Sequence, residues 1–256
     1  MKRTILSLMS VLLLSQVVAQ LPDADQIMNK SREQTVVGSM QATISLSITE
    51  KNGAKRNRTI AMTTKSFTGG LEKRFIEFLE PADVRGTAML IVDNKDVADE
   101  IWIYLPALKK TRRISSSENG KSFMSSEFSN ADMGSPRLAD FNSRHLEGSG
   151  TTNTWIIESV PVNDDKADEY GYTKKISYIS KDKFLVQKME FYNFDNEIFK
   201  TIEMRDFHTT PEGKFMVSDM IASNIVTNRK SEIHFNDIVD KVKVEDSFFT
   251  VQNLER

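Results

Sequence analysis

The sequence predicts a mainly β fold in which a single curved antiparallel sheet of about 10–11 strands forms a half-open β-barrel. Apolar residues alternate with period two in many short segments, turn signals separate these segments, and few stretches have helical periodicity. A sheet of this size must curl to cover one face, and short helices can then form a lid or plug on its concave side. The interior of such a half-barrel is wider than its side chains alone can fill.

The first predicted elements are a helix and a hairpin. A short helix is predicted over 23–32, with Asp23 as its N-cap and acidic residues in its first turn. A strand follows over 41–50, where isoleucine and leucine alternate with threonine and serine. Asn52-Gly53 is a strong hairpin signal, so the return strand is predicted over 58–65.

The remaining segments continue the strand pattern. Further strands, most of them separated by polar turns, are predicted over 73–79, 87–92, 100–105, 112–115, 154–161, 174–180, 185–192, 200–208, 214–224 and 230–235. Short helices are predicted at 129–133 and 135–142, the acidic segment 164–169 is predicted to be a solvated loop, and 246–254 is expected to close the structure. The chain has no repeats and no Pro/Gly-rich linker, so a single domain over 20–256 is predicted.

The N-terminal residues predict export. Two cations precede an apolar run over 5–14, and the small or modest residues that end at Ala19 suit cleavage. The apolar run is too short for a comfortable membrane span, and no other segment approaches one. Residues 1–19 are therefore predicted to be a signal peptide that is cleaved after Ala19.

Composition and charge exclude several classes of function. The chain has no cysteine, which excludes disulfides and thiolate chemistry. Its formal net charge of −2 becomes −4 when the two cations of the signal peptide are removed (−2 − 2), which argues against general nucleic-acid binding. The 15 phenylalanines and 12 methionines suit either a surface for variable ligands or an ordinary core.

Motifs of hydrolases and metal sites are missing from the sequence. There is no Gly-x-Ser-x-Gly, and His145, His208 and His234 lie far apart and outside any metal-binding pattern. The sequence therefore predicts no catalytic residue, no metal and no cofactor. Convergence of the histidines in the fold is left open.

The stretch 101–128 carries the strongest functional signal. An aromatic-rich strand runs into Pro106. Four cations follow within five residues, namely Lys109, Lys110, Arg112 and Arg113, and a second apolar cluster comes after them. Bulky apolar groups on both sides of a cationic ribbon suit an apolar ligand with an anionic head, and the alternative is a core strand followed by a solvated hairpin. The candidate lipid-binding residues are Phe75, Phe78, Trp102, Tyr104, Leu105, Phe123, Met124 and Phe128. An error of one residue in strand register would move half of them to the other face.

Motifs in this stretch and its flanks match one known family in the same order. They are Phe78, Pro81, Gly86-Thr87-Ala88, the run from Trp102 to Lys110, Arg112-Arg113-Ile114, and the run from Phe123 to Phe128, which corresponds to the family pattern FMGSDF. In these motifs the chain resembles the LolA/LolB-like outer-membrane lipoprotein-sorting proteins, and in particular the branch associated with RND-type exporters. It departs from the pattern at Ser125, where glycine is usual, and at Glu127, where aspartate is usual.

The resemblance implies an unclosed β-barrel with helices as a lid over an apolar cavity. It also implies a periplasmic carrier or acceptor that binds acyl chains of lipids or lipoproteins and delivers them to an outer-membrane acceptor. An acyl chain of about 16 carbons costs about 12 kcal/mol in water, so the cavity must supply comparable burial. A second hypothesis is a binding or sensor module that contacts an RND-type exporter or a receptor through the four cations, and a third is a lipid esterase.

Overall fold

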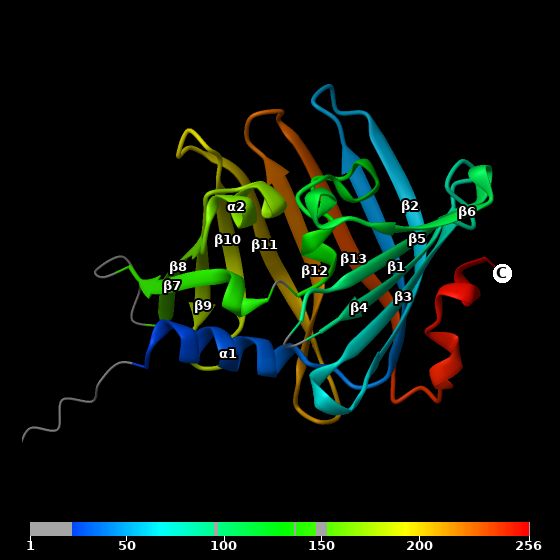
Figure 1. The fold of residues 1–256 in the computed structure, drawn as a ribbon, viewed down its shortest axis with the longest axis horizontal. Coiled ribbons are helices and arrows are strands. Elements are labelled where there is room, and N and C mark those ends of the chain that lie inside the picture. Colours follow the sequence, from blue (N-terminus) through cyan, green and yellow to red (C-terminus); the bar gives the residue numbers. More distant parts are fainter. Residues whose placement is uncertain (1–21, 95–96, 136, 147–152, 256) are drawn as a thin grey trace, which may run out of the picture.

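The computed structural model describes residues 22–94, 97–135, 137–146 and 153–255. The predicted signal peptide lies outside the described residues. None of the helices within these ranges is long and apolar enough to span a membrane. Figure 1 shows a curved sheet with one helix across its end and a connecting segment in front of its middle strands.

Thirteen strands in the described part of the chain form one antiparallel sheet, whose edge strands β6 and β7 do not pair with each other. The predicted fold class is therefore confirmed. The strands are β1 (Met40–Thr49), β2 (Lys55–Ser66), β3 (Glu72–Glu80), β4 (Ala88–Asp93), β5 (Glu100–Leu105), β6 (Lys110–Ile114), β7 (Phe141–His145), β8 (Thr154–Pro161), β9 (Lys174–Ser180), β10 (Val186–Tyr192), β11 (Ile198–Thr209), β12 (Phe215–Asn224) and β13 (Arg229–Asp240).

The order of the strands explains how the middle of the sheet becomes covered. Strands β1 to β6 run outward from the centre to one edge, and β7 to β13 return from the other edge until β13 pairs with β1. The segment 115–140 must therefore cross from one edge to the other, and we call it the crossover. In Figure 1 it lies in front of β12 and β13, and it contains the 3₁₀ turns η3 (Ser116–Glu118), η4 (Phe123–Ser125), η5 (Ala131–Met133) and η6 (Leu138–Asp140).

The predicted N-terminal helix is confirmed as α1 (Ala24–Thr35), with Asp23 in a capping box with Gln26. Its apolar stripe is narrow, so it depends on a larger partner. Ala24 and Ile27 provide that contact, because both are buried in one cluster with residues of β8 and β9. The helix therefore lies across one end of the sheet (Figure 1).

Two local predictions are wrong. The segment 164–169 was expected to be a loop but forms α2 (Asp164–Tyr170), because Asn163 Oδ1 accepts a hydrogen bond from the Lys166 backbone N–H at 2.9 Å and Gly171 ends the helix in the left-handed conformation. The helix expected over 135–142 is reduced to η6, and β7 replaces its end by pairing with β8. The pairing partner lies far along the chain, so local periodicity did not indicate it.

The sheet buries both of its faces around β4. Met89 and Ile91 join the large core on the concave side. Leu90 points to the outer side, where Phe249 and Leu254 cover it. These two residues belong to the C-terminal segment, which forms the 3₁₀ turns η7 (Asp246–Phe248) and η8 (Val251–Glu255) and lies outside β3 and β4 in Figure 1. Two further 3₁₀ turns follow β2 and β5, η1 (Thr68–Gly70) and η2 (Pro106–Leu108).

Candidate functional site

A cavity of about 410 Å³ lies on the concave side of the sheet. Its walls come from the middle strands, from α1, from the turn between β2 and β3, and from the end of the crossover. Its apolar lining includes Met28, Val37, Met40, Ile44, Met62, Phe67, Ile76, Met133, Phe141, Met204, Phe207, Met216, Met220, Ile233 and Phe235. Val36 also lines it and is 45% exposed, so the cavity reaches the surface beside the end of α1.

Methionine dominates the apolar part of this wall. Seven of the chain's twelve methionines line the cavity. Methionine is unbranched and polarizable, so such a wall adapts to apolar ligands of different shape. The composition predicted that the methionines would form either a surface for variable ligands or an ordinary core. These seven side chains lie where a ligand in the cavity could contact them.

One side of the cavity is closed by an ion pair between α1 and the sheet. Arg32 Nη2 lies 2.9 Å from Asp93 Oδ1, and only 6% of the Asp93 side chain is exposed. A buried carboxylate without a partner is costly, so this pair ties the last turn of α1 to the end of β4. The helix therefore covers the cavity as a lid. The apolar contacts of Ala24 and Ile27 hold it, together with this ion pair and a hydrogen bond of 2.8 Å from Lys214 Nζ to the Glu33 carbonyl.

A second acid lies beside this ion pair. Asp99 Oδ1 accepts a hydrogen bond from the Asn94 backbone N–H at 2.9 Å. Burial, and secondarily the charge of Asp93, raise the pKa of Asp99 to about 7. Nearby, Arg74 pairs with Glu72 at 2.6 Å and donates to the backbone carbonyl of Met133, which joins β3 to the crossover.

Lys175 and Asp132 also line the cavity, and Lys200 pairs with Asp132 from outside the lining. Lys200 Nζ lies 2.7 Å from Asp132 Oδ2 and 4.3 Å from the centroid of the Phe191 ring. Lys175 is only 8% exposed and lines the cavity, and its Nζ lies 5.2 Å from the centroid of the Phe141 ring. Among the described residues this ammonium has no hydrogen bond and no ion pair. Burial lowers the pKa of Lys175 to about 8; the charge of Asp132 opposes this decrease, and the charge of Lys200 adds to it to a smaller extent.

Sequence reasoning did not find Lys175. It stands in a predicted strand next to Lys174, and only the packing of distant segments buries one of these lysines and leaves the other partly exposed. The sequence offered one indication: in the strand's alternating pattern, either Lys174 or Lys175 must point to the buried face. That signal is weak, because the face of the strand was not known.

Five of the eight predicted lipid-binding residues lie in or against the concave core. Phe78, Phe123 and Phe128 are fully buried there, and Leu105 and Met124 pack against them. None of the five lines the cavity. They hold the crossover against β3 and β5, so a role in lipid contact stays a prediction.

The other three predicted residues lie on the outer face. Phe75, Trp102 and Tyr104 pack with the C-terminal segment, and the Phe75 and Phe248 ring centroids are 4.8 Å apart. None of the three lines the cavity. Successive residues of a strand point to opposite faces, and here the neighbouring residues Ile76, Ile101 and Ile103 point to the concave side. The structure thus separates the eight residues into two groups on opposite sides of the sheet.

The four predicted cations lie at the edge strand β6 and the turn before it. Arg112 makes two contacts with Glu118, at 2.9 and 3.1 Å, and Arg113 lies 3.4 Å from Glu100. Lys109 and Lys110 are exposed, and within the described ranges their ammonium groups have no hydrogen bond or ion pair. Of the four cations, these two have no carboxylate partner that would compete with another molecule, although Arg112 and Arg113 are also exposed.

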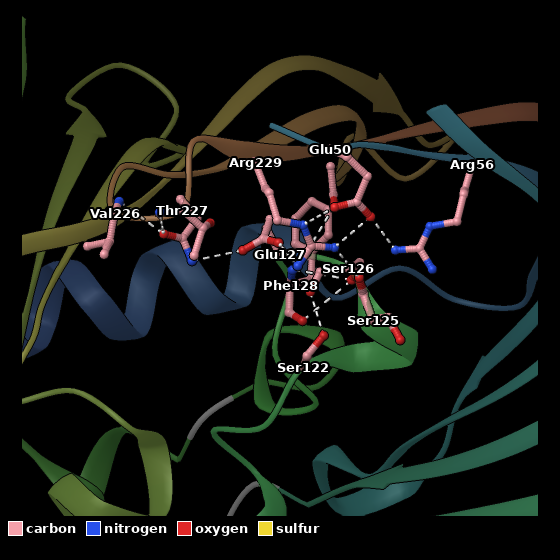
Figure 2. Close-up of polar contacts among 12 residues, drawn as sticks. Glu50, Arg56, Ser122, Ser125, Ser126, Glu127, Phe128, Val226, Thr227 and Arg229 are labelled. Atoms are coloured by element: carbon pink, nitrogen blue, oxygen red, sulfur yellow. Dashed lines mark hydrogen bonds and ion pairs between the residues drawn. The ribbon is translucent and has the colours of Figure 1, made fainter. Parts of the chain in front are cut away.

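The family motif from Phe123 to Phe128 is fixed to the ends of β1, β2 and β13 by a polar network (Figure 2). Arg229 lies at its centre, 2.8 Å from Glu127 and 2.8 Å from Glu50. Glu127 also accepts from Asn224 Nδ2 at 2.9 Å, and its backbone N–H donates to Ser231 Oγ at 2.9 Å. The motif thus anchors the crossover on the concave face.

The backbone of this motif explains the usual glycine of the family pattern. Met124 has φ 48° and Ser125 has φ 63°, so both are left-handed. Glycine adopts this conformation without strain. Ser125 keeps the turn that glycine would form, and its carbonyl accepts a hydrogen bond from Arg229 Nη2 at 3.0 Å.

Each of the three histidines contacts a different partner. His145 Nε2 lies 2.8 Å from the Pro22 carbonyl, His208 Nε2 lies 2.8 Å from Asp240 Oδ2, and His234 Nδ1 lies 3.1 Å from Asp219 Oδ2. In the part of the chain with described positions, no group of three or more His, Cys, Asp or Glu side chains could hold a metal ion.

Comparisons with known proteins agree with this architecture. A family model described as "uncharacterized protein" matches residues 70–256. No curated protein sequence matches the chain.

Several solved structures are similar along nearly their whole length. A protein from Vibrio parahaemolyticus described as an outer membrane lipoprotein-sorting protein domain has 25% identity and a TM-score of 0.82, over 91% of this chain and 98% of that one. A DUF1329 family protein from Desulfovibrio piger has 23% identity and a TM-score of 0.78, over 89% and 96%. A LolA superfamily protein from Nitrosomonas europaea has 18% identity and a TM-score of 0.68, over 90% and 98%. The last two likenesses concern the fold alone.

Proposed function

We propose that this chain, which belongs to the family whose model matches residues 70–256 and is similar in structure to a lipoprotein-sorting protein domain, is a periplasmic carrier of acyl chains. It shelters the chain of a lipid or a lipid-modified protein in the methionine-lined cavity and delivers it toward an outer-membrane acceptor. This role is binding and transfer, without catalysis.

The observation that carries the proposal is the cavity beneath α1. Its volume of about 410 Å³ falls near the lower end of the range of ~300–1,000 Å³ for ligand sites, which suits one acyl chain better than several. Burial is worth about 0.8 kcal/mol per methylene, so a wall of methionine, isoleucine and phenylalanine offsets much of the cost of taking the chain out of a membrane. Because methionine adapts its shape, chains of different length are accepted.

Loading and release require that the lid moves. The helix α1 is held by Ala24 and Ile27 and by the ion pair of Arg32 with Asp93, and the cavity reaches the surface beside Val36. We propose that the chain enters at this end when the last turn of α1 lifts. Phe78, Phe123 and Phe128, with the partly buried Leu105 and Met124, hold the crossover against the sheet and do not line the cavity.

Delivery also requires a surface that meets a partner. Lys109 and Lys110 are exposed beside the unpaired edge of β6, so they can contact lipid phosphates or an acidic patch. This observation favours a second candidate function, in which the protein is a binding or sensor module for a membrane partner such as an RND-type exporter. The double variant K109E/K110E tests this surface: uptake of acyl chains should stay unchanged, and capture of a membrane partner that binds there should be lost.

Titration with a fluorescent fatty acid, followed by native mass spectrometry, tests the carrier. Met204→Trp and Met220→Trp fill the cavity from two strands, and Val226→Trp is the control because Val226 is 72% exposed on a turn. We expect wild type and V226W to bind with a 1:1 mass shift, and both cavity variants to bind at least ~10-fold more weakly. Absence of uptake by wild type, or equal binding by all four proteins, would contradict the proposal.

A further inference from the structure

The unpartnered ammonium of Lys175 identifies the ligand more closely. Lys175 is 8% exposed, lines the cavity, and has no hydrogen bond or ion pair within the described residues. A buried charge without a partner is unfavourable, so buried ammonium groups are normally paired. The Phe141 ring, 5.2 Å from Nζ to its centroid, supplies a cation–π contact that is weaker than an ion pair.

The neighbouring charges do not neutralise Lys175. Phe191 on β10 lies between the two lysines, because it pairs with Lys175 on β9 and with Lys200 on β11. Asp132 is the carboxylate between the crossover and this wall. Its Oδ2 is already bound by Lys200 at 2.7 Å and by the Ser129 backbone N–H at 2.7 Å. Two ammonium groups thus share one carboxylate, and the Lys175 ammonium remains without an ion pair of its own in the cavity wall, where its strand neighbour Ser159 offers only a neutral hydroxyl.

We propose that the ligand is a single acyl chain that ends in an anionic head, with a fatty-acid carboxylate as the favoured form, and that Lys175 Nζ binds this head. The inference rests on the proposed carrier function, and it specifies the class of lipid. A carboxylate is compact enough to remain inside a cavity of this size, and it supplies the charge-assisted hydrogen bonds that Lys175 lacks. The methionine-lined part of the cavity then holds the tail.

Three ligands with the same tail and different heads test the inference. Palmitate carries a carboxylate, hexadecanol carries a neutral hydroxyl, and palmitoyl lysophosphatidic acid carries a phosphate. Affinities are measured by competition against the same fluorescent fatty acid. We expect wild type to bind palmitate at least ~10-fold more tightly than hexadecanol.

Lys175→Met removes the head contact and keeps an apolar side chain of similar length. Lys174→Met is the matched control, because Lys174 is the preceding residue and its Nζ instead lies 4.2 Å from the centroid of the Tyr192 ring. We expect K175M to lose the preference for palmitate and to keep its affinity for hexadecanol, and K174M to behave as wild type. Thermal unfolding verifies that each variant is folded. The comparison of palmitate with hexadecanol in the wild type does not depend on any variant.

The outcomes separate the two proposals. If wild type binds palmitate and hexadecanol equally, the anionic head is refuted and the carrier stands. If wild type prefers palmitate and K175M keeps this preference, Lys175 is refuted as the group that binds the head, and the carrier again stands. If no ligand binds, the carrier function fails and the inference falls with it. Tighter binding of the lysophosphatidic acid than of palmitate, lost in K175M, would support an anionic head and overturn the carboxylate in favour of a phosphate.

Discussion

Replacement of Arg32 by methionine should loosen the lid and lower the stability of the protein. The change removes the guanidinium that lies 2.9 Å from Asp93 and keeps most of the apolar length of the side chain. Because the Asp93 side chain is only 6% exposed, its carboxylate would remain buried without its main partner. Breaking a buried ion pair from one side costs about 3–5 kcal/mol.

The expected magnitude is smaller than that range, because Arg74 lies close enough to Asp93 to interact with it electrostatically. We therefore expect R32M to lower the free energy of unfolding by about 2 kcal/mol. If that loss falls on the contact of α1 alone, the population with an open lid rises by up to ~30-fold. Dissociation of a bound fatty acid should accelerate in the same direction.

Urea unfolding and hydrogen exchange of the α1 amides measure this effect. The double variant R32M/D93N removes both charges and should recover most of the lost stability, so the cycle should give a coupling of about 1–2 kcal/mol. Lys241→Met is the control, because its pair with Glu212 is exposed on both sides and should not contribute measurably to stability. A loss below about 0.5 kcal/mol in R32M, or additive effects in the cycle, would refute a lid held by this pair.

Three further predictions follow from the same structure. The pKa of Asp99 is raised from 3.8 to about 7, so the carboxyl does not destabilise the folded state below about pH 4, its destabilising effect grows between pH 4 and pH 7, and it is complete above pH 7. The full shift corresponds to about 4 kcal/mol, which partial exposure reduces, so D99N should raise the unfolding free energy by about 1–2 kcal/mol at pH 8 and by much less at pH 4 in urea titrations. An equal gain at both pH values would contradict this. Ser125→Gly should raise the unfolding free energy by about 0.5–1 kcal/mol, because φ is 63° there, and a loss of stability would show that the turn is unstrained. Gly120→Ala should lower it by about 1–3 kcal/mol, because the added Cβ would lie 2.8 Å from the Tyr170 backbone, and an unchanged melting temperature would exclude this close approach.

Local signals in the sequence were sufficient for most strands and for the lid helix. Period-two alternation and the Asn52-Gly53 turn placed the β1–β2 hairpin, and Asp23 placed the start of α1. The order of strands in the sheet depends on distant pairing. Because β13 pairs with β1, the chain must return across the concave face, and no local pattern records that path.

The candidate site was less predictable for a physical reason. Strands β3 to β5 are buried on both faces, so their apolar residues give no indication of which face meets the cavity. Trp102 and Tyr104 point to the C-terminal segment, whereas Ile101 and Ile103 point to the concave core. The seven methionines of the cavity wall are scattered over strands and segments far apart in the sequence, and the neighbours of Lys175 come from other strands.

A diazirine-labelled fatty acid would locate the bound acyl chain most directly. After irradiation of the complex, digestion and mass spectrometry identify the labelled peptides. We expect label on α1, on the end of β2 and on β11 and β12, at peptides that contain Met28, Met62, Met204 and Met220. Label confined to the outer face, at Phe75, Trp102 or Tyr104, would contradict a carrier that holds its ligand on the concave side.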